Sequence, residues 1–599
     1  MRRALPIFVA LAGLCAPVAA AHADPVNKGA SAAGPVRKGA SAPARTSAAG
    51  PPTVTAADLR FTSGQVLRYG SPQRAGLLPD AVAAIAKDAA GYMNPSPTTP
   101  LYPGAVVLAA RNGVVAEHEA MGYALRYADD KPTELPRDQW IPMRKDTIFD
   151  LASMSKLFTT VAAIQQIERG RIDLNATVAT YLPGFAQNGK GAITIRELLT
   201  HTSGLRPDLP FYNYSGRAAQ EAALFADTPQ ATPGTAYIYS DLNMITMQFV
   251  LEKVTGKTLD VLVRDGITGP LGMRDTGYNP AASEKPRIAA TEYEHKPYAA
   301  LDRGLVWGQV HDENSYALGG VAGHAGVFST AHDIAIFAQM ILDGGRYGHA
   351  RVLSEDSVRL LFTDLNTAFP GNAHGLGFEI GLRWYEDAMA SPVTIGHTGY
   401  TGTSIVIDPI SRSFAILLTN RVHPSRNWGS INPARRAVAH DLARAVPVRP
   451  ADGRDAWFSQ MNDNTTATLT APMPAGASRL SFHLWYDTEE TDIGVLETSP
   501  DGKTWTPAPL SLRAGRTAWT VNGAFSGFAG RRWATATATL PAGTTSVRWR
   551  YTTDPAYEGR GVYVDGVRAR DAAGRLVFDG ERPADAARFQ PVGWVRSAN

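Results

Sequence analysis

Runs of apolar residues predict strands at both ends of the larger, N-terminal part of the chain. Two runs flank an Asn-Gly pair at 112–113, which is typical of a tight hairpin turn, so strands are expected at 105–110 and 114–119. Two more are expected at 403–408 and 414–420. Helical patterns lie between these pairs, which predicts an antiparallel sheet flanked by helices and assembled from both ends of this part of the chain.

Three helical segments are marked by signals at their ends. The segment FDLASMSKLFTTVAAIQQIERG opens into a helix at Ser153. Thr194 and Glu197 fit a capping box before a short helix, and the run 242–254 is closed by Gly256, which suits a helix C-terminus. These helices are expected between the two pairs of strands.

The pattern changes after about residue 450, where strand patterns replace helical ones. Strands are expected at 479–486, 493–498, 546–551 and 561–567, and Asp501-Gly502 is a strong hairpin-turn signal. Short strands at this spacing predict a β-sandwich.

The N-terminus predicts a secretory signal. Arg2 and Arg3 precede an apolar stretch at 4–20, and Ala-His-Ala at 21–23 is a cleavage site. We therefore expect a cleaved signal peptide at 1–23, a secreted or periplasmic protein, and no transmembrane segment beyond that peptide. The alternative is a membrane anchor, against which the prolines in the apolar stretch and the cleavage site argue.

The cysteine count, the net charge and the length each exclude some classes of protein. The single cysteine, Cys15, lies in the expected signal peptide, so the mature chain would have no disulfide, thiol nucleophile or thiolate metal site. A formal charge of +3 argues against nucleic acid binding, which needs a clustered basic face. At 599 residues, roughly two or three domains are expected. The predicted parts are a signal peptide (1–23), a disordered Ala/Gly/Ser/Pro linker (24–66), an α/β domain (67–447) and a β-sandwich domain (452–599).

Ser153 and Lys156 are the strongest chemical signal in the chain. On a helix, positions three apart share one face, so the hydroxyl and the ammonium lie one turn apart. That arrangement can turn a serine into a nucleophile without a histidine. Ser155 is the competing serine, but the third residue after it is Phe158, so it lacks the lysine.

Tyr239 is the expected proton shuttle, at the start of Tyr239-Ser240-Asp241. A lysine ammonium nearby favours the phenolate, so the tyrosine can act as a base and then as an acid. The alternative is a half-buried loop tyrosine without a chemical role.

The segment His397-Thr398-Gly399 follows a strand-like run and completes the expected site. Gly399 would let a substrate lie close to the strand, and the backbone N–H groups of Ser153 and Tyr400 would form an oxyanion hole. His397 and Thr398 would hold a substrate carboxylate or carbonyl. The alternative is an ordinary strand with a polar rim.

These motifs, in this order, resemble the superfamily of class C β-lactamases and serine DD-peptidases over residues 67–446. The segment HTSGL at 201–205, a PGT before the tyrosine, and PLGM at 270–273 strengthen the resemblance. It implies a β-lactamase/transpeptidase-like α/β domain, in which an antiparallel sheet flanked by helices adjoins a helical subdomain and the site lies between the two. It also implies an acyl-enzyme mechanism that uses no cofactor.

Two positions depart from the superfamily pattern. Asp241 stands where an asparagine is common, and a carboxylate there would stabilise the Lys156 ammonium and weaken the lysine as a base. His397 stands where a lysine is common, which argues against an efficient β-lactamase and would make the activity sensitive to pH near neutrality.

Two longer segments, at 311–330 and 396–424, resemble the branch that contains the type 4B penicillin-binding proteins and exo-type muropeptide amidases. Four polar residues of the first segment would line the substrate cleft, and the alternative is that they are hydrogen-bonded loop residues. They are Asp312, Glu313, Asn314 and His324. Their spacing is not that of a metal site.

The segments at 479–505 and 560–567 resemble the jelly-roll module attached to immune inhibitor A-type metallopeptidases. Acidic residues of this module could bind a structural calcium ion through oxygen atoms, and the alternative is a solvated acidic strand edge. The candidates are Asp487, Glu489, Glu490, Asp492 and Asp565. Trp485 and Tyr486 suggest a glycan-binding face, although alternating aromatic residues also suit a sandwich core.

The resemblance implies an exported serine hydrolase of cell-wall peptides, in the first place a D-Ala-D-Ala carboxypeptidase for which β-lactams would be acylating ligands. The same site could instead cleave a MurNAc–L-Ala amide, a β-lactam or a small ester. A third hypothesis is a catalytically inactive protein that binds cell wall or senses penicillin, against which the intact Ser-Lys-Tyr set argues.

Overall fold

The computed structural model describes residues 50–62, 64–95 and 99–599. The predicted signal peptide and the part of the predicted linker before residue 50 lie outside the described residues. The described part of that linker differs from the prediction, because Ala56 and Leu59 are buried in the main core and the Thr62 hydroxyl donates to Asp343 at 2.7 Å. The packed α/β region therefore begins before residue 67, because Ala56 and Leu59 are part of its core.

The central sheet of the α/β region (residues 50–446) combines strands from both ends of that region, as the sequence predicts. In spatial order its strands are β1 (Arg68–Tyr69), β3 (Val114–Leu125), β2 (Gly104–Arg111), β15 (Ser413–Thr419), β14 (Thr403–Asp408), β13 (Ile395–Gly399) and β12 (Glu379–Ile380), and β4 (Ile141–Pro142) pairs with β3. Every pair is antiparallel except β1 with β3. The predicted hairpin turn is confirmed at Asn112 and Gly113, which both have positive φ.

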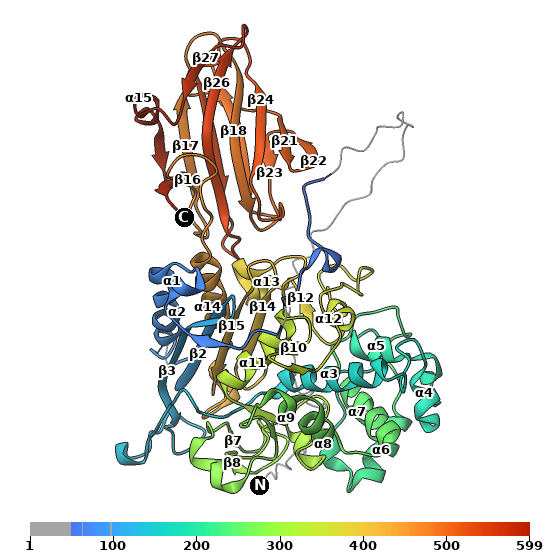
Figure 1. The fold of residues 1–599 in the computed structure, drawn as a ribbon. Coiled ribbons are helices and arrows are strands. Elements are labelled where there is room, and N and C mark those ends of the chain that lie inside the picture. The colour runs from blue at the N-terminus through green and yellow to red at the C-terminus, as the bar shows by residue number, and fades with distance from the viewer. Residues whose placement is uncertain (1–49, 63, 96–98) are drawn as a thin grey trace, which may run out of the picture. The chain divides into compact units, whose positions relative to one another are not determined.

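The two faces of this sheet supply separate cores, because successive side chains of a strand point to opposite faces. The helices against the sheet include α1 (Pro72–Ala75), α2 (Pro79–Gly91), α3 (Ser155–Glu168), α11 (Ala331–Leu342) and α14 (Asn432–Ala445). In β2, Val106 and Leu108 share a core with α3 and α11. Val107 and Ala109 share the other core with α2 and α14, which lie beside β2 in Figure 1.

Further helices extend the core that contains α3. They are α4 (Val178–Tyr181), α5 (Ile195–Leu199), α6 (Arg217–Ala226), α7 (Asp241–Thr255), α8 (Leu259–Val263), α9 (Gly269–Leu271), α10 (Glu313–Ala317) and α12 (Glu355–Leu361). Helix α13 (Arg383–Glu386) instead joins the core of α2 and α14, through Tyr385. The predicted capping box of Thr194 and Glu197 begins α5, and Gly256 in the left-handed conformation ends α7. None of the helices in the described part of the chain is long and apolar enough to cross a membrane.

Short strands complete the α/β region. They are β5 (Phe149–Asp150), β9 (Val327–Ser329) and β6 (Gly277–Tyr278) in one sheet, β7 (Tyr293–Glu294) with β8 (Gly304–Leu305), and β10 (Arg346–Tyr347) with β11 (Ala350–Arg351). The first of these sheets places β9 next to β5, the strand that leads into Ser153.

The C-terminal β-region (residues 456–597) consists mainly of two antiparallel sheets, which confirms the predicted strand-rich pattern. One contains β22 (Thr517–Val521), β21 (Leu510–Ala514), β24 (Ala534–Thr539), β18 (Ala477–Asp487), β26 (Gly561–Asp571), β16 (Ala456–Phe458), β29 (Val595–Ser597) and β27 (Leu576–Asp579). The other contains β20 (Thr506–Pro507), β19 (Ile493–Ser499), β25 (Ser546–Thr552), β17 (Thr466–Pro472), β28 (Gln590–Val592) and β23 (Ala524–Phe525). The region also holds the short helix α15 (Pro583–Ala586).

The two sheets share one core, to which Phe482 contributes from β18 and Trp549 from β25. Trp485 and Tyr486 are each only 3% exposed, so they pack inside the protein rather than present a glycan-binding face. The alternative interpretation of these aromatic residues, a place in the core, is the one that the structure supports.

Candidate active site

Ser153 lies in a tight turn between β5 and α3. The turn is a 3₁₀ segment at Ala152–Met154, so the α-helix begins at Ser155 and not at Ser153 as predicted, because Ala152 has a positive φ of 46° that departs from the helical path. Ser153 is half-buried, whereas Ser155 is 0% exposed and its hydroxyl accepts a hydrogen bond from the Val327 N–H at 3.0 Å. Of the two serines, only Ser153 is accessible to a substrate.

Lys156 is buried and paired with a carboxylate. Its Nζ atom lies 2.7 Å from Asp241 Oδ1 and 4.7 Å from the centroid of the Tyr239 ring. Burial lowers the pKa of Lys156, but the charges of Asp241 and Tyr239 and hydrogen bonds to both raise it by more, so the pKa is above its ordinary value. Lys156 is therefore held as an ammonium ion, which makes it a source of positive charge and a poor base.

Tyr239 joins the ammonium to the serine. The pKa of Tyr239 is above its ordinary value, because burial raises it and the Asp241 charge adds to that effect, while the Lys156 ammonium and hydrogen bonds from Lys156 and Ser153 offset only part of the rise. The phenol oxygen thus contacts the hydroxyl of Ser153 on one side and the ammonium of Lys156 on the other. Ser153, Tyr239, Lys156 and Asp241 form a continuous set of contacts, which suits transfer of a proton from the serine to the tyrosine.

His201 holds the tyrosine segment in place, a role that the sequence analysis did not assign to it. Its ring stacks on Tyr239 with centroids 4.6 Å apart, and its Nδ1 accepts the Ser240 N–H at 3.1 Å. The Asn243 amide lies 3.0 Å from the same nitrogen. Burial lowers the pKa of His201 well below its ordinary value, so the ring is neutral and can accept these bonds. The only sequence signal for this contact is the HTSGL segment.

Strand β13 lies against the turn that carries Ser153. A Cβ atom on Gly399 would fall 2.2 Å from the Leu151 carbonyl oxygen, so only glycine fits there. The Thr403 hydroxyl donates to the same carbonyl at 3.0 Å. Because β12 pairs with β13 only at Ile395 and Gly396, the segment His397-Thr398-Gly399 continues past its partner strand.

His397 is a neutral histidine. Burial and the nearby Lys156 ammonium lower its pKa to about 3. Its Nδ1 donates to the Thr398 carbonyl at 2.8 Å, and its Nε2 has no hydrogen-bond partner among the described residues. The expectation that His397 would make activity sensitive to pH near neutrality is therefore wrong, because the ring titrates far below that range. Nε2 is instead a buried acceptor for a substrate N–H or hydroxyl group.

The predicted oxyanion residue Tyr400 follows β13 directly. Its ring stacks on that of His311, with centroids 5.8 Å apart, and the Arg421 guanidinium lies 4.8 Å from its centroid. Because the Tyr400 ring packs between His311 and Arg421, we do not assign its phenol a part in the chemistry. The backbone of Tyr400 is the part that the predicted oxyanion hole uses.

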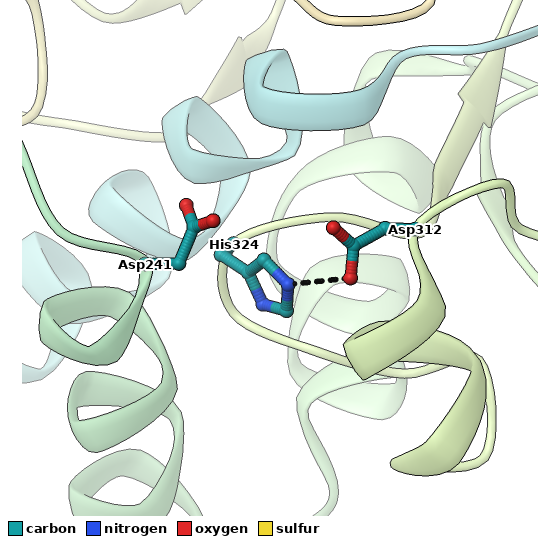
Figure 2. Close-up of side chains that lie close together, drawn as sticks. All are labelled: Asp241, Asp312 and His324. Atoms are coloured by element: carbon teal, nitrogen blue, oxygen red, sulfur yellow. Dashed lines mark hydrogen bonds and ion pairs between the residues drawn. The ribbon is translucent and has the colours of Figure 1, made fainter. Parts of the chain in front are cut away.

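Of the four polar residues predicted to line the cleft at 312–324, two are hydrogen-bonded loop residues and two lie beside the candidate site. Glu313 is buried and ion-paired with Arg426 at 2.8 Å, and Asn314 accepts the Phe211 N–H at 2.8 Å, as expected of structural loop residues. Asp312 and His324 instead lie beside Asp241, as Figure 2 shows, and are bonded to each other at 2.8 Å. The His324 carbonyl also accepts from Lys156 at 3.5 Å, so this pair borders the candidate site.

Three groups among the described residues have ligand atoms close enough to share a metal ion. They are Asp241, Asp312 and His324; Glu292, Glu294 and His311; and Glu489, Asp492 and Asp554. In the first group Asp241 already neutralises Lys156, and in the second the arginines Arg303 and Arg426 neutralise the two glutamates. These two groups are explained by ion pairs within the chain.

The third group overlaps the calcium site predicted from the sequence. Burial raises the pKa of Glu489 to about 7 and that of Asp492 to about 6. Asp487 is bound elsewhere, by Arg531 at 2.7 Å, and Asp565 accepts the N–H groups of Ala451 and Asp452. The carboxylates that could hold a calcium ion together are therefore Glu489 and Asp492 with Asp554, a residue that the sequence analysis did not name.

Comparison with known proteins identifies the family of the α/β region. The Beta-lactamase family model matches residues 94–440. A protein of Escherichia coli K12 named "Putative D-alanyl-D-alanine carboxypeptidase" is 33% identical over 350 residues, which cover 54% of this chain and 79% of that protein. A protein of the same name from Salmonella typhimurium is 33% identical over 361 residues, covering 55% of this chain and 82% of that protein.

Among solved structures, a penicillin-binding protein homolog from Caulobacter crescentus is similar with a TM-score of 0.47 and 20% identity, covering 61% of this chain and 99% of that one. The family match spans more than half of the chain and includes Ser153, Lys156 and Tyr239. The chain therefore belongs to the β-lactamase family of serine hydrolases, and its α/β region has the β-lactamase/transpeptidase-like fold.

Proposed function

We propose that this protein is a serine D-Ala-D-Ala carboxypeptidase that acts on cell-wall peptides through an acyl-enzyme on Ser153. The observation that carries the proposal is the continuous set of contacts from the half-buried Ser153 through Tyr239 to the Lys156–Asp241 ion pair. The relatives named for this activity, at 33% identity, support the choice of substrate.

Acylation begins when the Ser153 oxygen attacks the carbonyl carbon of the scissile D-Ala-D-Ala amide. Tyr239 accepts the serine proton in its phenolate form, which burial disfavours and which the Lys156 ammonium and the hydrogen bonds from Lys156 and Ser153 stabilise. The backbone N–H groups of Ser153 and Tyr400 stabilise the oxyanion that develops on the carbonyl oxygen. The C–N bond then breaks, and Tyr239 returns the proton to the amine of the leaving D-alanine.

Deacylation repeats these steps with water as the nucleophile. Tyr239 removes a proton from the attacking water, and the ester bond to Ser153 breaks while the proton passes to the serine oxygen. Lys156 keeps its charge throughout, because Asp241 lies 2.7 Å away, and so stabilises each phenolate state of Tyr239. The chemistry uses side chains of this chain alone.

Substrate contacts come from β13 and its continuation. The half-buried Thr398 hydroxyl would donate to the carbonyl or the terminal carboxylate of the peptide, and the unpartnered Nε2 of His397 would accept a hydrogen bond from a peptide N–H group. Because His397 is neutral, it contributes a hydrogen bond and no charge to this contact.

Incubation of the mature protein with purified muropeptides, followed by mass spectrometry, tests the proposal. Loss of one terminal D-alanine is the expected result, and it should disappear in Ser153→Ala but persist in the matched control Ser155→Ala. Release of an intact stem peptide from MurNAc would replace the proposal with an amidase. Serine-dependent turnover of only a β-lactam or a small ester would replace it with a lactamase or an esterase.

We also propose that the protein works outside the cytoplasm, on the basis of the signal sequence at 1–23. Cell fractionation with N-terminal sequencing of the exported form should give a mature chain that starts at Asp24. Retention of the full-length chain in the cytoplasm would contradict this proposal.

A further inference from the structure

An arginine-rich cavity lies beside two turns of the central sheet, one between β2 and β3 and one between β14 and β15. Residues of the C-terminal β-region also line it. Its volume is about 610 Å³, and Asn112 from the β2–β3 turn and Ser411 from the β14–β15 turn are part of its wall. Five arginines line it, and no aspartate or glutamate does. They are Arg111, Arg449, Arg531, Arg532 and Arg560.

Among the described residues, Arg531 is the one cavity arginine that makes ion pairs with carboxylates. Arg531 pairs with Asp408 at 2.6 Å and with Asp487 at 2.7 Å, and it connects the two regions of the protein. Within the described residues, none of the other four cavity arginines makes an ion pair with a carboxylate. The carboxylates of Asp58, Asp408 and Asp487 act on these arginines only from beyond ion-pair distance, so the cavity keeps an excess of positive charge.

Arg560 is the most deeply placed of the uncompensated arginines. It is only 6% exposed, it donates to the Val446 carbonyl, and its guanidinium lies 5.3 Å from the centroid of the Trp485 ring. Burial and the neighbouring Arg531 charge lower its pKa to about 10. A buried guanidinium without a carboxylate is costly, and an anionic ligand would offset that cost.

Aromatic residues complete the wall. Trp485 and Trp533 both line the cavity, and the Trp533 indole N–H donates to the Arg449 carbonyl at 2.9 Å, which fixes that stretch of backbone at the rim. Guanidinium groups bind carboxylate and phosphate oxygens in pairs, and an aromatic ring offers an apolar surface to a ring-shaped ligand. The volume lies within the range of small-ligand sites, roughly 300 to 1,000 Å³.

The cavity is separate from the candidate active site. Strand β14 begins at Thr403, whose hydroxyl contacts Leu151 beside Ser153, and ends at Asp408, which pairs with the cavity residue Arg531. Six strand residues span about 17 Å, so the two sites lie at opposite ends of the same strand. A ligand in the cavity would leave Ser153 accessible.

We propose that this cavity binds an anionic saccharide, a sugar ring that carries a carboxylate or a phosphate group. Such a ligand supplies negative charge to the four arginines that lack an ion pair, and its ring can lie against Trp533, which is half-buried, whereas Trp485 packs inside the protein. The alternative is that these arginines only hold the two regions of the protein together. That explains Arg531, which pairs with a carboxylate of each region, but it does not explain Arg449 and Arg532, which are exposed at the rim.

Isothermal titration calorimetry of the whole mature protein at low salt tests this inference. Glucuronic acid and glucose 6-phosphate are the probes for the two anionic groups, and glucose is the neutral control. Saturable binding of at least one charged sugar, with a Kd below about 1 mM and no comparable binding of glucose, is expected. Absence of saturable binding of both charged sugars, or equal binding of glucose, would overturn the proposal.

Charge-reversal variants locate the binding. Arg532→Glu and Arg449→Glu should each weaken the sugar by about 10-fold or more, whereas Arg513→Glu, an exposed arginine of the same β-region outside the cavity, should bind as the unmodified protein does. The thermal unfolding midpoint checks that each variant is folded, and the milder Arg532→Gln replaces any that is not. Undiminished binding in the cavity variants would place the ligand elsewhere.

Discussion

The two ends of strand β14 place buried cations in opposite surroundings. At the Thr403 end, Lys156 faces the Asp241 carboxylate at 2.7 Å and the Tyr239 phenol. At the Asp408 end, Arg560 is also buried but contacts a tryptophan ring and a backbone carbonyl, and it makes no ion pair with a carboxylate among the described residues. Both positions cost free energy of desolvation, but the pKa of Lys156 is raised overall whereas that of Arg560 is lowered, so the chain offsets the cost fully only at the first.

This difference shows that an ion pair suits a buried cation to catalysis, whereas the lack of one suits it to ligand binding. A cation paired with a carboxylate keeps one protonation state through a reaction cycle, which is what a proton shuttle needs from its neighbour. An unpaired cation leaves its charge available to a ligand that arrives from solution. The cavity variants above test the unpaired cations, and the variants below alter the paired ones and their neighbours, in order of decreasing expected effect.

Removal of the paired cation should have the largest effect. Lys156→Ala should lower kcat/KM on the D-Ala-D-Ala peptide by a factor on the order of 10³ or more, because Tyr239 loses the charge that favours its phenolate. Rapid-quench measurement of acylation is the readout. The matched control is Lys190→Ala, a buried lysine whose Nζ donates to the Phe225 carbonyl, which should cost stability but little activity. A Lys156→Ala enzyme that acylates at a near-normal rate would contradict the assignment.

Loss of the histidine that positions the tyrosine should have an intermediate effect. His201→Ala should lower kcat by about 10- to 100-fold with little change in KM, since Tyr239 would shift from its contact with Ser153. His201→Asn should recover most of the rate, because its side-chain oxygen can accept the Ser240 N–H and asparagine tolerates the φ of 56° at this position. Equal activity of the alanine and asparagine variants would indicate that His201 acts only on stability.

A third cation, the half-buried His440, connects the two regions and should make stability depend on pH. Burial lowers its pKa, but hydrogen bonds to Asp387 at 3.2 Å and to Glu558 at 3.1 Å raise it by more, to about 10. Because the pKa is higher in the folded state, this stabilisation is complete below the unfolded value of about 6.5 and is lost as the pH rises through about 10.

His440→Gln should therefore lower the free energy of unfolding by about 2 kcal/mol at pH 6 and by much less above pH 10. Urea unfolding of the variant and the unmodified protein at both pH values gives the difference. The exposed His349→Gln serves as the control and should show no such dependence. A loss of the same size at both pH values would show that His440 contributes packing and not charge.

The smallest expected effect is that of the carboxylate beside Lys156. Asp241→Asn should change kcat/KM at pH 7 by less than about 10-fold, but it should move the alkaline limb of the pH profile to lower pH, because Lys156 loses the partner that raises its pKa. The exposed pair Lys257–Asp265 supplies a control, Asp265→Asn, that should leave the profile unchanged. Collapse of activity in Asp241→Asn would instead assign a chemical step to the carboxylate.

Local signals in the sequence predicted the elements well. The hairpin turn at Asn112 and Gly113, the capping box at Thr194 and the helix end at Gly256 each depend on residues within one turn of the chain. Their physics is contained in the short segment that carries them, so no knowledge of the tertiary fold is needed.

Features that depend on distant residues were predicted less completely. The contact of His201 with Tyr239 joins positions 38 apart through a left-handed backbone residue, and the group of Glu489 and Asp492 is completed by Asp554 from a loop far along the chain. The charge state of His397 depends on its burial and on Lys156, neither of which is visible in the local pattern. Spacing along the chain carries no information about such contacts.

Trapping of the acyl-enzyme tests the central claim most directly. A turnover mixture with the D-Ala-D-Ala peptide is quenched in acid, digested, and mapped by mass spectrometry to find the residue that carries the acyl group. The account predicts an ester on Ser153, absent from Ser153→Ala and retained in Ser155→Ala. An acyl group on Ser155, or steady turnover by Ser153→Ala, would contradict it.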